Sequence, residues 1–242
     1  MTKVYWNFCT ALSNNKNINN LTHFDILGIP PIPCLKYISE LKNTPYYLKC
    51  PAFTDFYENT FVILSPYDIT ISRDIESGRY VFQEFDDRVV ENFVKNREGQ
   101  TSNINAFFTM PPHLLFWSDS SVLIESFPTP FDTESQVGQK IKTIPGVFNI
   151  GKWYRSVDFS FEALTNNLPV IIKRGDPLFC IRLTPDKKDK IILEQTEITN
   201  QMKDLIYGFT GIKRVKKFLS LNKLYEIAKP IIDFYRKSRG NK

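Results

Sequence analysis

Short segments that alternate between apolar and polar residues constrain this chain more than any other feature. The clearest is residues 157–164, in which every second side chain is apolar. Successive side chains of a β-strand point to opposite faces of a sheet, so this period predicts a half-buried strand with Phe159 and Phe161 in the core. Further strands are predicted at residues 61–64, 68–72, 80–85, 106–110, 114–117, 122–127, 169–172, 178–183 and 191–194.

Turn signals separate these strands. Pro111-Pro112 is predicted to break one of them, and Asn166-Asn167 marks a turn between the strands at 157–164 and 178–183, which we expect in one sheet. Many short strands with such spacing predict a mainly β body of sandwich or barrel type. Residues 1–50 are expected to be irregular, apart from one short helix near Leu35–Leu41, because asparagines and prolines crowd this region.

The pattern changes to a helical period near the C-terminal end. Helices are predicted at Thr199–Tyr207 and Ile212–Leu221, separated by Gly208 and Gly211. A third segment, residues 222–239, has a helical apolar stripe that Pro230 should kink or end. We expect this stripe to pack on the β body through Leu224, Ile227, Ala228, Ile231 and Ile232.

These changes suggest three parts: an irregular segment over residues 1–45, a β domain over 46–196 and a basic helical extension over 197–242. From Asn200 onward there are eleven Lys or Arg against three Asp or Glu, an excess of eight cations, whereas the whole chain has a net charge of +5. A nucleic-acid or acidic partner could bind the most basic stretch. Helices whose lysines simply face water are the favoured alternative. The candidate partner-binding residues are Lys213, Arg214, Lys216 and Lys217.

Residues 145–183 resemble the central block of trimeric dUTPases and dCTP deaminases. The match consists of a Gly-Val-Phe-Asn turn, a Tyr-Arg pair, an Asn-Asn turn and a Gly-Asp step into an apolar strand: residues 146–149, 154–155, 166–167 and 175–179. The resemblance implies a dUTPase-like β-clip body, a trimer and a pyrimidine-nucleotide ligand. The whole chain also resembles uncharacterised proteins of tailed phages, which implies a viral origin.

The departures from this family argue against its hydrolysis reaction. Asn149 stands where the family has the aspartate that activates water, and a neutral amide cannot accept the proton. The serine pair Ser120-Ser121 follows Asp119 instead of an arginine, and an acid would repel phosphates. By resemblance, Asn149, Tyr154, Arg155, Ser120 and Ser121 remain candidate ligand-binding residues.

One candidate catalytic residue is left by the comparison with deaminases. Glu162 lies near the place of the glutamate that activates water in that family, but a solvent-facing charge on an alternating strand is the favoured interpretation. A second alternative is a non-haem iron site of two histidines and one carboxylate. It would use His23, Asp25 and His113, and His23 and His113 are the two histidines of the chain.

We therefore expect a non-catalytic binding or assembly protein, with an atypical nucleotide hydrolase or deaminase as the alternative. No cofactor and no metal site are predicted for the binding protein, whereas a nucleotide enzyme on this fold would use Mg²⁺. The four scattered cysteines and the lack of a long apolar segment predict free thiols, no membrane span and a cytoplasmic or virion location. The expected partner is another protein or further copies of the chain.

Overall fold

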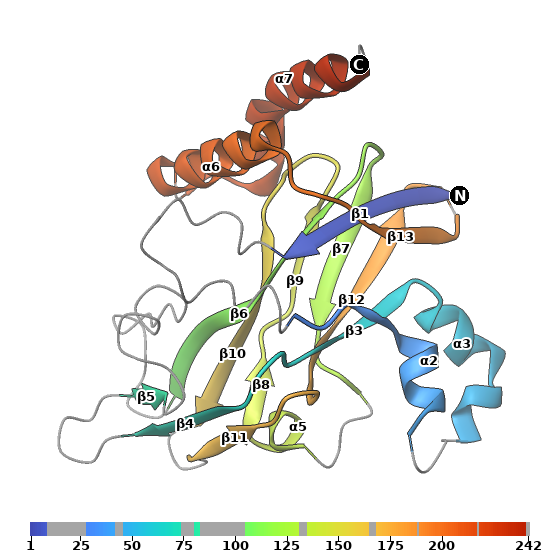
Figure 1. Cartoon of the computed structure of the whole chain (residues 1–242), viewed down its shortest axis with the longest axis vertical. Coiled ribbons are helices and arrows are strands. Elements are labelled where there is room, and N and C mark those ends of the chain that lie inside the picture. Colours follow the sequence, from blue (N-terminus) through green and yellow to red (C-terminus); the bar gives the residue numbers. More distant parts are fainter. Residues whose placement is uncertain are drawn as a thin grey trace.

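The computed structural model describes residues 1–8, 28–41, 46–73, 80–82, 105–130, 135–164, 168–187, 189–216 and 218–240. Within these residues the protein is mainly β, as predicted, with a pair of C-terminal helices beside one end of the sheets (Figure 1). The predicted turn at Asn166-Asn167 and residues 83–85 of the strand predicted at 80–85 lie outside the described residues. No described helix is both long enough and apolar enough to cross a membrane.

The described strands form three sheets. The first has the order β13-β1-β6-β10-β8, the second β2-β3-β12-β7-β9, and a small third sheet has the order β11-β4-β5. Neighbouring strands are antiparallel except for β1 and β13, which are parallel. Their bounds are β1 Thr2–Phe8, β2 Ile32–Pro33, β3 Thr60–Leu64, β4 Ile69–Arg73, β5 Tyr80–Phe82, β6 Asn105–Trp117, β7 Val122–Phe127, β8 Ile141–Thr143, β9 Gly146–Asn149, β10 Ser156–Leu164, β11 Val170–Ile172, β12 Pro177–Pro185 and β13 Ile191–Gln195.

Helices occupy the edges of this β body. A short helix and a 3-10 turn follow β2, and a further helix precedes β8. Two longer helices end the chain. The bounds are α2 Cys34–Ser39, η2 Tyr46–Lys49, α3 Pro51–Tyr57, α5 Gln136–Lys140, α6 Asn200–Val215 and α7 Leu221–Gly240.

Strand β10 behaves as its sequence predicts, with one correction. Phe159 and Phe161 are buried, and the alternating residues Asp158, Ser160 and Glu162 are partly exposed. Strand β12 also forms, but the expectation that β10 and β12 share a sheet is wrong. They lie in the two facing sheets, and the Phe159 ring stacks on Phe179 of β12 with centroids 5.7 Å apart. Both strands have an apolar face that must be buried. A strand of the facing sheet can cover that face, so alternation alone does not place the two strands in the same sheet.

The N-terminal segment was predicted to be irregular, and this is wrong for Thr2–Phe8. These residues form β1 between β13 and β6, with Val4 and Trp6 in the core. The predicted break at Pro111-Pro112 is also wrong. Strand β6 continues through the prolines, where its register against β10 shifts between Val157 and Phe159. A bulge tolerates proline because the ladder is interrupted there.

The tail differs from its prediction at the glycines, and the helix does not end at Pro230, where a kink stays a prediction. Helix α6 continues through Gly208 and Gly211, and α7 continues through Pro230. Glycine costs a helix only about 1 kcal/mol, which burial of one face can offset. Of the predicted stripe of α7, Leu224, Ala228 and Ile232 pack on the body as expected, whereas Ile227 is partly exposed and Ile231 is 39% exposed. The buried residues of the two helices are Met202, Ile206, Phe209, Leu224, Ala228, Ile232 and Tyr235.

The helices share a core cluster with one end of the β body. Leu115 and Trp117 of β6 belong to it, as do Trp153 and Tyr154 of the loop that follows β9. The Trp153 ring stacks on Phe209 of α6, with ring centroids 4.8 Å apart. This second core cluster is separate from the core between the sheets. It packs α7 against residues 153–154, which lie within the segment 145–183.

Candidate functional site

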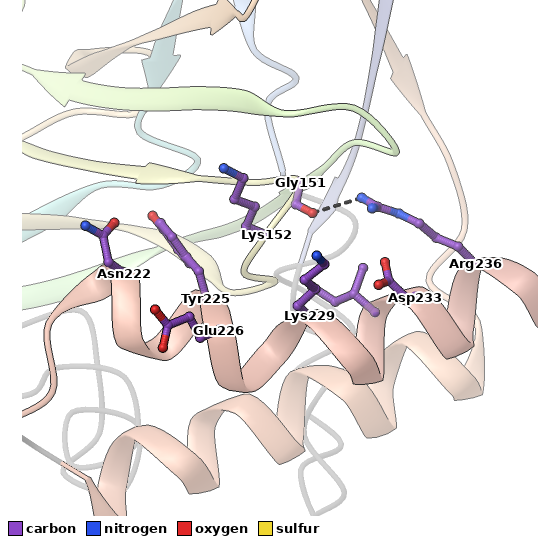
Figure 2. A pocket seen from close by; sticks show the side chains of 9 residues that line it. Gly151, Lys152, Asn222, Tyr225, Glu226, Lys229, Asp233 and Arg236 are labelled. Atoms are coloured by element: carbon purple, nitrogen blue, oxygen red, sulfur yellow. Dashed lines mark hydrogen bonds between the residues drawn. The ribbon is translucent and has the colours of Figure 1, made fainter.

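The candidate site is a pocket of about 400 Å³ between α7 and the turn that follows β9. Figure 2 shows the side chains of α7 rising toward this turn. Two residues come from the turn and seven from α7, so neither part forms the pocket without the other. The lining residues are Gly151, Lys152, Asn222, Tyr225, Glu226, Lys229, Ile232, Asp233 and Arg236.

Asn149 lies directly behind this pocket and is only 4% exposed. Its Oδ1 accepts a hydrogen bond of 2.9 Å from the Gly151 amide, and its Nδ2 donates one of 2.8 Å to Ser121 Oγ. Its backbone amide donates to the Tyr225 hydroxyl over 2.8 Å. The side chain therefore holds the turn in shape, and both ends of its amide are engaged by the protein itself.

The two predicted serines contact this turn as well. Ser121 Oγ donates to Asp186 Oδ1 over 3.0 Å while it accepts from Asn149. Ser120 approaches through its backbone: a Cβ atom added to Gly151 would lie 2.0 Å from the Ser120 carbonyl oxygen. The structure thus brings Asn149, Ser120 and Ser121 together, as the resemblance suggests. Neither serine lines the pocket.

Replacing Gly151 by alanine should destabilise the protein by about 1–3 kcal/mol, because the new methyl group needs space that a backbone carbonyl occupies. Denaturant unfolding of Gly151→Ala measures the loss. Gly208→Ala is the matched control, since nothing lies within 4 Å of a Cβ there and alanine favours the helix. Equal free energies of unfolding for Gly151→Ala and Gly208→Ala would contradict the close packing of the loop after β6 on the turn after β9.

Tyr154 and Arg155 are neighbours in sequence but face different surroundings. Tyr154 is fully buried in the second core cluster, and burial raises the pKa of its hydroxyl to about 12 although Arg236 opposes the rise. Arg155 donates from Nε to the Ser156 carbonyl, and its guanidinium lies 5.2 Å from the Phe148 ring centre. Neither side chain lines the pocket, so a direct ligand contact by this pair stays a prediction.

Arg236 is a central residue of the site that the resemblance did not indicate. Its Nη2 donates to the Ser118 carbonyl over 3.0 Å and to the Gly151 carbonyl over 2.8 Å, as Figure 2 shows for Gly151. Its Nε lies 3.8 Å from Asp119 Oδ1. One guanidinium thus joins α7 to the loops after β6 and β9. Tyr225 and Arg236 are eleven residues apart and so lie on one face of a helix, which was the available signal, but only the fold reveals what that face contacts.

The charge in the pocket is predominantly positive. Lys152, Lys229 and Arg236 contribute cations, and Glu226 and Asp233 contribute acids. Glu226 is already paired, because its Oε2 lies 2.7 Å from Lys223 Nζ one turn earlier in α7. Arg236 is likewise paired with Asp119, so Lys152 and Lys229 stand against Asp233. This balance favours a ligand with an anionic group over a cationic one.

Glu162, the candidate catalytic residue, is not part of the pocket. It lies near the end of β10 that pairs with β8, whereas α7 packs beside the opposite end of the sheets (Figure 1). Its carboxylate is 3.6 Å from Lys142 Nζ across the strand pair, and its side chain is 31% exposed. This placement agrees with a surface charge on an alternating strand.

The remaining candidates divide between described and undescribed parts of the chain. Lys213 and Lys216 are exposed at the end of α6, while the Arg214 side chain and Lys217 are outside the described set. His23, Asp25 and the side chain of His113 are also outside it, so the iron site stays a prediction. Among the residues that the structure describes, no cluster of three or more metal-ligating side chains occurs. Cys34, Cys50 and Cys180 form no disulfide, as expected.

No protein-family model, curated protein or solved structure matches this chain.

Proposed function

We propose that this protein is a non-catalytic binding or assembly protein of viral origin, built on a dUTPase-like β fold, and that the pocket between α7 and the turn after β9 is its ligand site. The observation that carries the proposal is the engagement of Asn149. Its amide oxygen and nitrogen bond to Gly151 and Ser121, so this side chain maintains the pocket wall. A buried amide with satisfied partners has no group left with which to activate water.

The ligand that the pocket fits best is a small molecule with a phosphate or carboxylate group. Lys152, Lys229 and Arg236 supply positive charge, and Tyr225 adds an aromatic ring. Its volume of about 400 Å³ falls within the usual range for small-molecule sites. The resemblance to nucleotide-binding proteins suggests pyrimidine nucleotides as the first compounds to test, with and without Mg²⁺.

A thermal-shift experiment tests the ligand site. A ligand at 100 times its Kd stabilises a protein by about 2.7 kcal/mol, which for a chain of this size corresponds to a rise in Tm of roughly 5–10 °C. Lys229→Gln should reduce the rise caused by dUMP, dCMP or inorganic pyrophosphate. Lys237→Gln, which changes the same charge on α7 outside the pocket, should not. No rise with any of these anions would contradict the proposed ligand class.

Assembly is supported by apolar side chains on the outer face of the two C-terminal helices. Phe234 is 75% exposed, and Tyr207 and Ile231 are each more than a third exposed. Clustered exposed apolar groups commonly mark protein contacts. We assign this face to a second copy of the chain, with the trimer implied by the resemblance as the expected state. Light scattering at increasing protein concentration tests this, and a monomer at all concentrations would contradict it.

Purified protein is expected to hydrolyse dUTP no faster than buffer with Mg²⁺ alone, because Asn149 replaces the required carboxylate. Release of pyrophosphate measured by a coupled assay checks this. Rapid release that Asn149→Ala abolishes would show that the atypical-enzyme alternative is correct. If dCTP were deaminated instead, Glu162→Gln should remove the activity, since the amide keeps the shape of the side chain but cannot accept a proton.

A further inference from the structure

The turn between α6 and α7 exposes two apolar side chains that the fold does not use. Phe218 is 100% exposed and Val215 is 83% exposed, whereas the apolar stripes of both helices face the second core cluster. A wholly exposed phenylalanine contributes nothing to packing. A contact made outside the folded chain would account for it.

The same turn has a concentrated positive charge. The sequence from Lys213 to Phe218 contains four cations and no acid, and Lys213 and Lys216 are exposed in the structure. Cations at the C-terminal end of α6 interact favourably with the helix dipole, which explains one or two of them. The dipole does not explain why an exposed aromatic ring lies next to them.

We propose that this turn binds single-stranded nucleic acid, with the cations on the phosphates and the Phe218 ring stacked on an unpaired base. Sequence-tolerant binding of single strands combines these two elements. A duplex would hide the base faces, so it offers this ring no stacking partner. An amphipathic helix that enters a lipid surface needs a broad apolar face, and here the broad faces of α6 and α7 are buried in the protein.

Fluorescence anisotropy with a labelled oligothymidylate of about 20 nucleotides, at increasing salt, tests the proposal. Single-strand binding loses affinity with a log–log salt slope of about −0.7 for each phosphate contacted, so Lys213→Gln with Lys216→Gln should reduce the slope by about 1.4. Phe218→Ala should weaken binding by about fivefold or more, the loss expected for one stacked base. Tyr46→Ala is the matched control, since it removes another exposed aromatic ring that lies outside both this turn and the face assigned to assembly.

Further measurements distinguish base stacking by Phe218 from other ways in which this turn could bind a partner. An abasic oligonucleotide of equal length should bind more weakly than oligothymidylate, and Phe218→Ala should not change its affinity. Equal binding of the two oligonucleotides would overturn the stacking of Phe218 on a base. Sedimentation with phosphatidylserine vesicles in the absence of oligonucleotide binding would assign the turn to a lipid surface and overturn the proposal. Failure of the intact protein to bind any oligonucleotide at about 50 mM salt would overturn it as well. All variants should keep the Tm of the parent, because the substituted side chains are exposed.

Discussion

Deletion of residues 222–242 is expected to leave a protein that unfolds at much lower denaturant or becomes insoluble. The deletion removes Leu224, Ala228, Ile232 and Tyr235 from the second core cluster and takes away the ring of Tyr235 that contacts Tyr154. Burial of such side chains contributes about 1.5–3 kcal/mol each, so the loss is comparable with the 5–15 kcal/mol that stabilises a typical domain. Salt should change the stability of the intact protein little, because exposed ion pairs contribute only about 0–1 kcal/mol each.

A matched pair of point variants separates packing from aggregation of the shortened chain. Ile232 is 2% exposed and Ile231 is 39% exposed, although they are adjacent on α7 and have the same side chain. Ile232→Ala should cost about 2–5 kcal/mol in the free energy of unfolding, and Ile231→Ala clearly less. Urea unfolding of both variants measures the difference. Equal losses in the free energy of unfolding for the two variants would show that α7 is not part of the core. An unchanged Tm on deletion, together with salt-sensitive nucleic-acid binding by α7, would show that the tail is a nucleic-acid-binding arm.

The second large effect is expected in the core between the two five-stranded sheets. Phe159→Ala should cost about 3–5 kcal/mol, since the ring is fully buried and its removal leaves a cavity. Its ring stacks on Phe161 within β10, with centroids 4.7 Å apart, and on Phe179 across the sheets. Urea unfolding measures the free energy lost in Phe159→Ala and in Phe218→Ala, which removes an exposed ring. The difference between the two losses gives the effect of burial. A cost below about 1 kcal/mol would contradict this packing.

Phe159→Leu should retain part of the lost stability, because leucine fills more of the space than alanine does and remains apolar. Phe159 lies in the layer between the two five-stranded sheets, so a smaller side chain there leaves a cavity.

The functional residues divide between those that local sequence indicates and those that only contacts reveal. The resemblance pointed to Asn149, Ser120 and Ser121, and the structure does bring them together behind the pocket. It did not indicate that Tyr225 and Arg236 of α7 bond to the same turn, at sequence separations of 76 and 85 residues. No short motif specifies a hydrogen bond over such a distance.

The sequence by itself determined the elements whose pattern matches their local period. The alternation in β10 predicted its buried side chains, and the helical stripe of α7 predicted Leu224, Ala228 and Ile232, because each element has an apolar face that must leave water. Local pattern also predicted the mainly β class, since most of the strands are short apolar segments between turn residues.

Only the tertiary structure decided where these faces meet. It placed β10 and β12 in opposite sheets, inserted β1 between β13 and β6, and continued α6 and α7 through glycine and proline. The pocket likewise exists only because α7 packs on the turn after β9. The physical reason is that burial is non-directional: a sequence specifies that a face is apolar, whereas shape, register and long-range hydrogen bonds select the partner that covers it.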